Sequence, residues 1–211
     1  MPRPEDDLVE LPPFPLVHER GRVRHDPIPA GSWGFELLFL RSQRCPCGGR
    51  FDSVGSRVHE PALECHEAVC DACARVRPFW FDIHLFHDDP RAHFRFEELR
   101  VMFEEAMERV GQNDLDAALP RFEEVTAREP WFGVAWFHRG MIALVNEGFD
   151  EAREYLETAV GILPLDASVH QSLAELWMQT GDDERATRAA WMAMTLEATL
   201  DDSLDEDQDD G

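Results

Sequence analysis

Apolar side chains recur every three or four residues through the second half of the chain, which is the spacing of an amphipathic helix. Two such stretches are VAWFHRGMIALV, at 134–145, and DEAREYLETAVGIL, at 150–163. The first half instead holds two runs rich in aromatic and branched residues, at 35–43 and 75–86, as strands prefer. The pattern therefore predicts an α+β protein that is mainly α.

Small residues in the helical half return at intervals of 34 positions. A helical hairpin of this length cannot bury its apolar face alone, so the period predicts three stacked hairpins with small residues where helices approach closely. A proline that recurs at the same interval is expected to follow the end of a helix. The columns are Ala118, Ala152 and Ala186; Ala106, Gly140 and Ala174; Ala159 and Ala193; and Pro130 and Pro164.

These residues resemble the pattern of the tetratricopeptide repeat (TPR) family. The middle copy is the closest, with Trp136 and Gly140 in its first helix, Ala152 in its second and Pro164 at its end. The third copy has Gly181 in the turn between its helices. The resemblance covers residues 99–200, with copies at 99–132, 133–166 and 167–200, within a domain at 93–200.

The resemblance implies a concave groove that is lined by the first helix of each pair and binds a peptide or a protein. The family members that hold a C-terminal carboxylate need lysine, asparagine and arginine here, whereas these positions are apolar or acidic. An apolar groove suits the apolar face of a helix or a hydrophobic strand. Two interpretations stay open: an external partner fills the groove, or the chain's own N-terminal half covers it. The groove residues are Phe103, Met107, Val110, Phe137, Met141, Leu144, Val145, Gln171, Glu175 and Met178.

Four of the five cysteines form two closely spaced pairs, Cys45 with Cys47 and Cys70 with Cys73. An odd cysteine count without an export signal argues against disulfides. Residues two apart in extended backbone point the same way, and the glycines after the first pair permit a tight turn. Four thiolates in tetrahedral geometry would hold a structural Zn²⁺ with no open position. Residues 35–86 thus resemble a zinc ribbon, within a domain at 33–92.

The fifth cysteine, Cys65, and its neighbour His66 leave alternatives open. Either could replace one of the four ligands, Cys65 most simply in place of Cys45. The other interpretation is a free buried thiol and a surface imidazole.

The charge is strongly negative and unevenly distributed. The chain carries a formal charge of −23, and all of its basic residues other than histidine are arginines. Residues 1–92 hold 15 acidic residues and 11 arginines, and residues 93–211 hold 28 and 9. Such a field repels phosphate backbones and anionic lipids. Without lysine the chain cannot carry a Walker A loop or a Schiff-base nucleophile, and no other catalytic motif is complete, so we expect no enzyme.

Both ends of the chain are predicted to lack regular structure. Residues 1–32 form a proline-rich extended arm, and residues 201–211 form an acidic, disordered tail. No apolar run is long enough to span a membrane and the start lacks a signal-peptide pattern, so a cytoplasmic location is expected. In the last helix, Trp191 and Met192 fall outside the expected inner stripe of Ala186, Ala190, Ala193 and Met194. This predicts either a homodimer contact or partial burial of Trp191.

Taken together, the sequence predicts a non-enzymatic adaptor or scaffold that binds a protein partner through its repeats and carries a structural zinc ribbon. The alternative is a zinc-ribbon protein that binds nucleic acid and recruits other proteins through its repeats. In its favour, six arginines lie around the cysteines, with Phe79 and Trp80 nearby for base stacking. The net negative charge argues against it.

Overall fold

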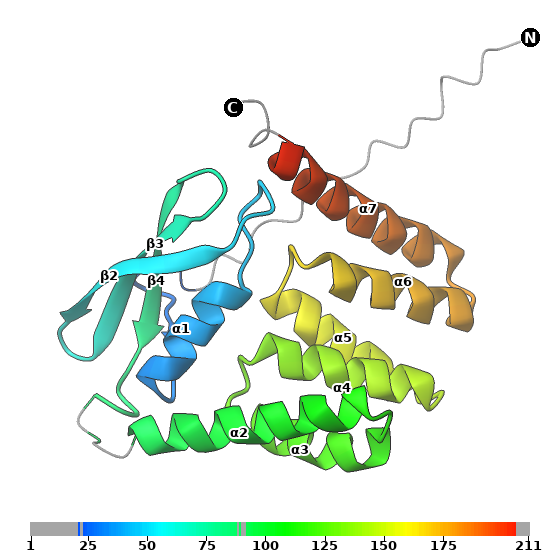
Figure 1. Ribbon diagram of the computed structural model, residues 1–211, viewed down its shortest axis with the longest axis horizontal. Coiled ribbons are helices and arrows are strands. Elements are labelled where there is room, and N and C mark those ends of the chain that lie inside the picture. Colours follow the sequence, from blue (N-terminus) through cyan, green and yellow to red (C-terminus); the bar gives the residue numbers. More distant parts are fainter. Residues whose placement is uncertain (1–20, 22, 88, 90–91, 206–211) are drawn as a thin grey trace, which may run out of the picture.

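The computed structural model describes residues 21, 23–87, 89 and 92–205, which form a small sheet with one helix followed by a row of helical hairpins (Figure 1). The predicted α+β class, mainly α, is confirmed. The strands are β1 (Ile28–Pro29), β2 (Phe51–His59), β3 (Leu63–Cys70) and β4 (Val76–Asp82). The helices are α1 (Trp33–Ser42), α2 (Ala92–Gly111), α3 (Leu115–Arg128), α4 (Gly133–Val145), α5 (Phe149–Ile162), α6 (Ala167–Thr180) and α7 (Asp183–Asp205).

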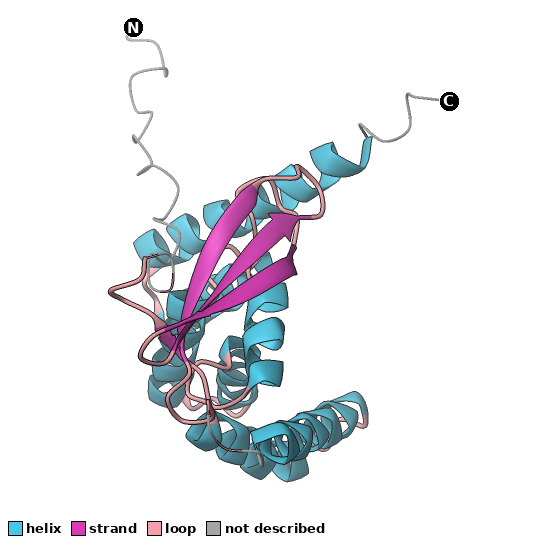
Figure 2. Cartoon of the chain, turned by 90° about the vertical axis from the view of Figure 1, so that its left-hand side faces the viewer, coloured by secondary structure: helices cyan, strands magenta, loops and turns pink. Residues whose placement is uncertain are grey.

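The sheet has the order β1-β4-β3-β2, with two antiparallel pairs and the short β1 running parallel to β4. Figure 2 shows the strands of this sheet beside the helices. Strand β4 confirms the strand expected within residues 75–86. Along β3, alternate side chains are buried, as a strand with one covered face requires. Strand β1 lies inside the segment that was expected to be an irregular arm, while residues 1–20 and 22 of that arm lie outside the described residues.

The strand expected at residues 35–43 is wrong, because this segment is helix α1. The side chain of Ser32 accepts a hydrogen bond from the backbone N–H of Phe35 and so caps the first turn. Phe35, Phe39 and Leu40 are buried on one side of the helix, and the Phe39 ring meets the Phe81 ring of β4 edge-on at 5.8 Å. An N-cap and a helical spacing of apolar residues thus outweigh the strand preference of the aromatic side chains.

Helices α2 to α7 form three antiparallel hairpins, as the 34-residue period predicts. The small residues lie at the helix contacts: Ala106, Ala118, Ala152 and Ala159 have no exposed surface. At Gly140, a Cβ atom would lie 2.6 Å from Cγ of Leu156, so no larger residue fits without a shift. Helix α5 ends at Ile162, shortly before Pro164, and Gly181 caps α6 in the left-handed conformation, as expected.

The N-terminal module, which we define as residues 28–87, packs against one end of the repeat helices (Figure 1). Helix α1 contacts α2, where Gly34 lies so close to Phe96 that a Cβ atom would approach its ring to 2.3 Å. The side-chain amide of Gln43 donates to the carbonyl of Ile162 at 3.1 Å. The buried residues of the module and of the repeats form one continuous apolar cluster. The two parts therefore share a core.

The last helix is longer than predicted. Helix α7 continues to Asp205, so the first residues of the predicted disordered tail are helical, and residues 206–211 lie outside the described residues. Among the helices of the described part, none is long and apolar enough to cross a bilayer.

Candidate metal centre and partner-binding groove

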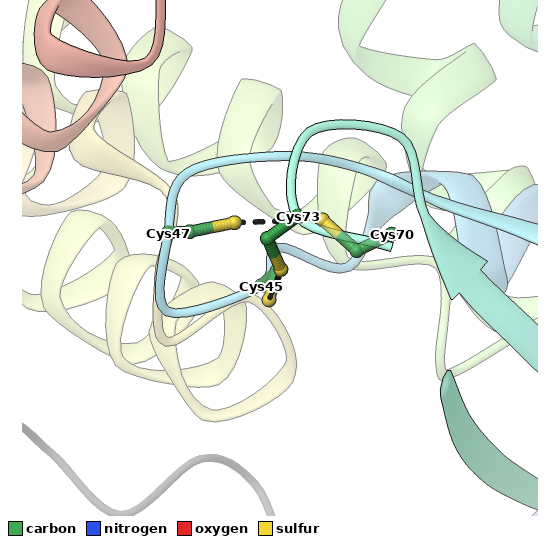
Figure 3. Close-up of side chains that lie close together, drawn as sticks. All are labelled: Cys45, Cys47, Cys70 and Cys73. Atoms are coloured by element: carbon green, nitrogen blue, oxygen red, sulfur yellow. Dashed lines mark hydrogen bonds between the residues drawn. The ribbon is translucent and has the colours of Figure 1, made fainter. Parts of the chain in front are cut away.

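Four cysteines from two turns meet at one end of the sheet (Figure 3). Cys45 and Cys47 lie between α1 and β2, Cys70 ends β3, and Cys73 lies in the turn before β4. The Sγ atoms of Cys45 and Cys73 are 3.7 Å apart, those of Cys47 and Cys70 are 3.5 Å apart, and all four lie within 4.8 Å of one another. The structure thus brings the four sequence-predicted ligands together.

The first turn depends on its two glycines for different reasons. Gly48 has a φ of +90°, and its N–H donates to the carbonyl of Cys45 at 2.8 Å. Gly49 accepts from the N–H of Cys45 at 2.8 Å, and a Cβ atom on Gly49 would lie 2.5 Å from Sγ of Cys70. One glycine therefore supplies the left-handed backbone, and the other lets the second turn approach.

The second turn folds back on itself and is fastened to the first. The N–H of Cys70 donates to the carbonyl of Arg75, and the N–H of Ala74 donates to Cys70, both at 3.0 Å. The N–H of Arg50 donates to Oδ1 of Asp71 at 2.7 Å, and the N–H of Asp71 donates to the carbonyl of Arg50 at 3.0 Å. This reciprocal pair fixes the distance between the two cysteine pairs.

The sulfur spacing fits a tetrahedral metal site. Four sulfurs at about 2.3 Å from one Zn²⁺ lie about 3.8 Å apart, close to the observed distances, whereas a disulfide requires about 2.05 Å. Burial raises the pKa of Cys45, Cys47 and Cys70, while the backbone N–H of Arg75 and contacts with the other cysteines lower the pKa of Cys73 to about 7. Binding a metal ion would require these thiols to give up their protons. These residues could hold a metal ion.

Cys65 and His66 do not belong to this group. Cys65 is half-buried on β3, in register with Trp80 of β4, and lies outside the sulfur cluster. His66 is 1% exposed and points to the opposite side of the strand, where it contacts Glu36. The expected surface imidazole is thus wrong, because alternation along β3 turns His66 into the core.

The first cysteine turn also faces the repeats across a small cavity. A cavity of about 70 Å³ separates the turn from the loop between α5 and α6. Arg44, Cys45 and Gly48 line it on one side, and Leu196 of α7 contributes to the other together with residues 165–168. The cysteine cluster therefore lies where the N-terminal module meets the third repeat.

The ten predicted groove residues do not form one exposed wall. Phe103 packs in an aromatic cluster with Phe122 and Phe132, and the sulfur of Met141 accepts a hydrogen bond from Ser172. Leu144 is buried. Most apolar positions of the first helices thus pack against neighbouring helices within the array. Phe103, Met107, Val110, Phe137 and Met141 are half-buried, and Val145, Gln171, Glu175 and Met178 are exposed.

The described part of the N-terminal half, residues 21, 23–87 and 89, does not cover the exposed groove residues. The module reaches the N-terminal part of α2 and two loops between repeats, at Glu129 and at residues 162–168. It leaves the C-terminal ends of α4 and α6 open, where Val145 and Met178 are 64% and 65% exposed.

A second apolar surface, which we call the open-end groove, lies between α6 and α7. It has a volume of about 510 Å³, and Met178 and Met194, at 65% and 69% exposed, are its most accessible apolar residues. Met178 stands 34 positions after Leu144, which is 5% exposed and belongs to the continuous apolar cluster. Met178 is instead exposed in the last hairpin that the structure describes. The groove is lined by Met178, Asp183, Ala186, Thr187, Ala190, Trp191 and Met194.

The predicted inner stripe of α7 is right for Ala186 and Ala193, which are buried, and wrong for Met194. Met194 is exposed, whereas Met192 is 9% exposed and packs with Leu165 and Leu196. Trp191 is half-buried against the same small cluster. Helix α7 contacts α6 on one side and the α5–α6 loop on another, so its buried arc is wider than a single stripe.

Several residues that were expected to contact nucleic acid already make contacts within the chain. Arg41 pairs with Asp52 at 3.3 Å, and Arg44 is half-buried beside the repeat loop, where burial lowers its pKa. The Trp80 ring lies 5.0 Å from the His59 ring and is also covered by Arg24.

Comparison with known proteins identifies the helical part. The tetratricopeptide repeat family model matches residues 103–167 and 139–193. Residues 103–193 are tetratricopeptide repeats. The repeat helices pair as α2 with α3, α4 with α5 and α6 with α7. Helices α4 and α6 begin at residues 133 and 167, whereas α2 begins at Ala92, before the first predicted copy at 99–132.

Solved structures give only weak likenesses to this chain. A structure of MamA from MSR-1 is 25% identical, with a TM-score of 0.44, and the match covers 47% of this chain and 57% of MamA. A structure of the CopN-Scc3 complex is 18% identical, with a TM-score of 0.46, covering 58% of this chain and 77% of that one. At TM-scores below 0.5 these likenesses carry no weight for function. No curated protein matches the chain.

Proposed function

We propose that the chain is a non-enzymatic adaptor whose TPR array binds a helical segment of a protein partner in the open-end groove. The observation that carries this proposal is the exposure of Met178 and Met194 beside Trp191. In the preceding repeat, the residues 34 positions earlier are buried Leu144 and half-buried Val160. In a stack of helical hairpins each hairpin packs on the next through its helices, so a helix is the shape that we expect the groove to accept.

The charge of the array selects among helices. Residues 93–211 hold 28 acidic residues against 9 arginines, and Asp183 lines the groove itself. A partner helix with an apolar face and flanking lysine or arginine residues gains favourable electrostatics. A second copy of this chain would bring the same negative field, so we favour an external partner over the homodimer that the C-terminal helix suggested.

We further propose that Cys45, Cys47, Cys70 and Cys73 hold a structural Zn²⁺. A soft thiolate donor set favours Zn²⁺, and four protein ligands leave no position for a substrate. The ion would fasten the two cysteine turns and, through the first turn, would orient the N-terminal module on the loop between α5 and α6. The cytoplasmic location stays a prediction.

The test compares a groove variant with a surface control. The double variant Met178→Glu with Met194→Glu places charges in the groove, and Val54→Glu changes an equally exposed residue on β2. Tagged full-length chains capture partners from the native host, and each candidate is then purified and its affinity measured directly. We expect a partner that binds the native chain and the control at least about tenfold more tightly than the groove variant.

Two outcomes contradict the proposal. One is a purified partner that binds all three chains equally well. The other is a concentration-dependent dimer, seen by light scattering, that the groove variant abolishes, because it would assign the groove to a second copy. Metal analysis of the native chain tests the zinc site separately, and a sulfur cluster without zinc contradicts it.

A further inference from the structure

A second group of metal-ligating side chains lies inside the N-terminal module, away from the cysteines. Glu36 projects from α1, and Glu64 and His66 project from alternate positions of β3 toward it. Nε2 of His66 is 3.1 Å from Oε2 of Glu36 and 3.6 Å from Oε1 of Glu64. Their exposed fractions are 0%, 6% and 1%. Three ionisable groups are thus gathered in an apolar core.

The charges of this group do not balance by themselves. Two carboxylates with one imidazolium leave one negative charge in excess, and an uncompensated buried charge is strongly unfavourable. Oε1 of Glu36 is moreover buried without any hydrogen-bond partner among the described residues. A bound cation would both balance the charge and supply a partner for this oxygen.

We propose that Glu36, Glu64 and His66 form a buried binding site for a divalent first-row metal ion. A divalent ion with two carboxylates and a neutral imidazole has a net charge of zero. Ligand atoms at about 2.1 Å from such an ion lie about 3.0 Å apart in octahedral and about 3.4 Å apart in tetrahedral geometry. The observed separations of 3.1 and 3.6 Å match these values. A carboxylate that binds the ion through both oxygens would also satisfy Oε1 of Glu36.

The surroundings of His66 suit a metal ligand. Its other ring nitrogen, Nδ1, lies 2.9 Å from Oγ of Ser53 on β2, and such a second hydrogen bond orients metal-bound histidines. Oxygen and imidazole ligands favour Zn²⁺, Mn²⁺ or Fe²⁺. Because the site is closed to solvent, the ion would be structural and would connect α1 to the middle of the sheet. This site and the cysteine centre would then fix the module at two points.

Metal counting on the full-length chain tests the site. Glu36→Gln removes a charged ligand, and Glu67→Gln changes an exposed glutamate on the same strand as a control. After removal of bound metal and reconstitution with Co²⁺, we expect two ions per chain for the native protein and the control, and one for Glu36→Gln. Cys70→Ser should also retain one ion, at the oxygen and nitrogen site.

The Co²⁺ spectrum of the native chain distinguishes the two sites without the need for a folded variant. In the native chain, one equivalent should produce intense thiolate-to-cobalt charge-transfer bands, and a second should add only weak visible absorption. Bound Mn²⁺, which thiolates disfavour, should reach one ion per chain by electron paramagnetic resonance. Saturation at a single Co²⁺ with thiolate bands, together with no bound Mn²⁺, would overturn the proposal.

Discussion

The TPR array and the N-terminal module are stabilised in different ways. In the array, helices that are adjacent in sequence pack in pairs, and small residues repeat at each contact, so the stabilising contacts are local and distributed. In the module, residues far apart in sequence meet at two points, the four cysteines and the group of Glu36, Glu64 and His66. A single substitution should therefore have a much larger effect in the module than at most positions of the array.

The largest expected effect is the loss of the cysteine centre. Cys70→Ser should release one zinc ion per chain and destabilise the N-terminal module by several kcal/mol, because a structural zinc contributes on the order of 10 kcal/mol in small domains. Helicity by circular dichroism should stay mostly intact, since α2 to α7 form their own contacts. Cys65→Ser, outside the cluster, is the matched control and should retain the zinc. Equal zinc content in Cys70→Ser and Cys65→Ser would contradict the assignment of Cys70 to the zinc site, and with it the expected difference in stability between the module and the array.

Two glycine variants test how local the packing of the array is. Gly140→Ala should destabilise the chain by about 1–3 kcal/mol, because the new methyl group meets Leu156 at 2.6 Å in a close helix contact. Gly161→Ala, in α5 with open space around it, should stabilise the chain by up to about 1 kcal/mol through helix propensity. Urea denaturation measures both. If both variants change the free energy of unfolding in the same direction, the contact between Gly140 and Leu156 accommodates the added methyl group.

The groove variants should affect binding and leave folding unchanged. Met178→Glu alone should change the free energy of unfolding by less than about 0.5 kcal/mol, because its side chain is 65% exposed. Its matched partner in the column, Leu144→Glu, should destabilise the chain by several kcal/mol, because that position is buried. Thermal denaturation of the two variants gives the difference. Similar losses would show that a part of the chain covers Met178.

The smallest expected effect is on nucleic-acid affinity. With a net charge of −23, the chain should pass through a heparin column at low salt without retention. Retention that falls steeply with salt would instead favour the nucleic-acid alternative, and Arg57→Ala, at an exposed position of β2, would then be expected to weaken it.

Much of the architecture follows from local patterns. The spacing of Ala118, Ala152 and Ala186 predicts the stacked hairpins, and the spacing of the four cysteines, with Gly48 and Gly49, predicts two turns that meet. The helix α1 was missed because its aromatic residues favour a strand on average. The signal that identifies it, Ser32 as an N-cap before apolar residues at helical spacing, was present in the sequence.

The sequence by itself determined the elements that depend on neighbours along the chain: the helical repeats, the turns between them and the cysteine turns. Only the tertiary structure decided which of these side chains are covered. Leu144 and Met178 occupy equivalent positions of the 34-residue period, yet Leu144 is buried in the shared core and Met178 is exposed in the last hairpin that the structure describes. Likewise, Glu36 and His66 meet through the packing of a helix on a sheet, a contact between residues 30 positions apart that no local pattern encodes.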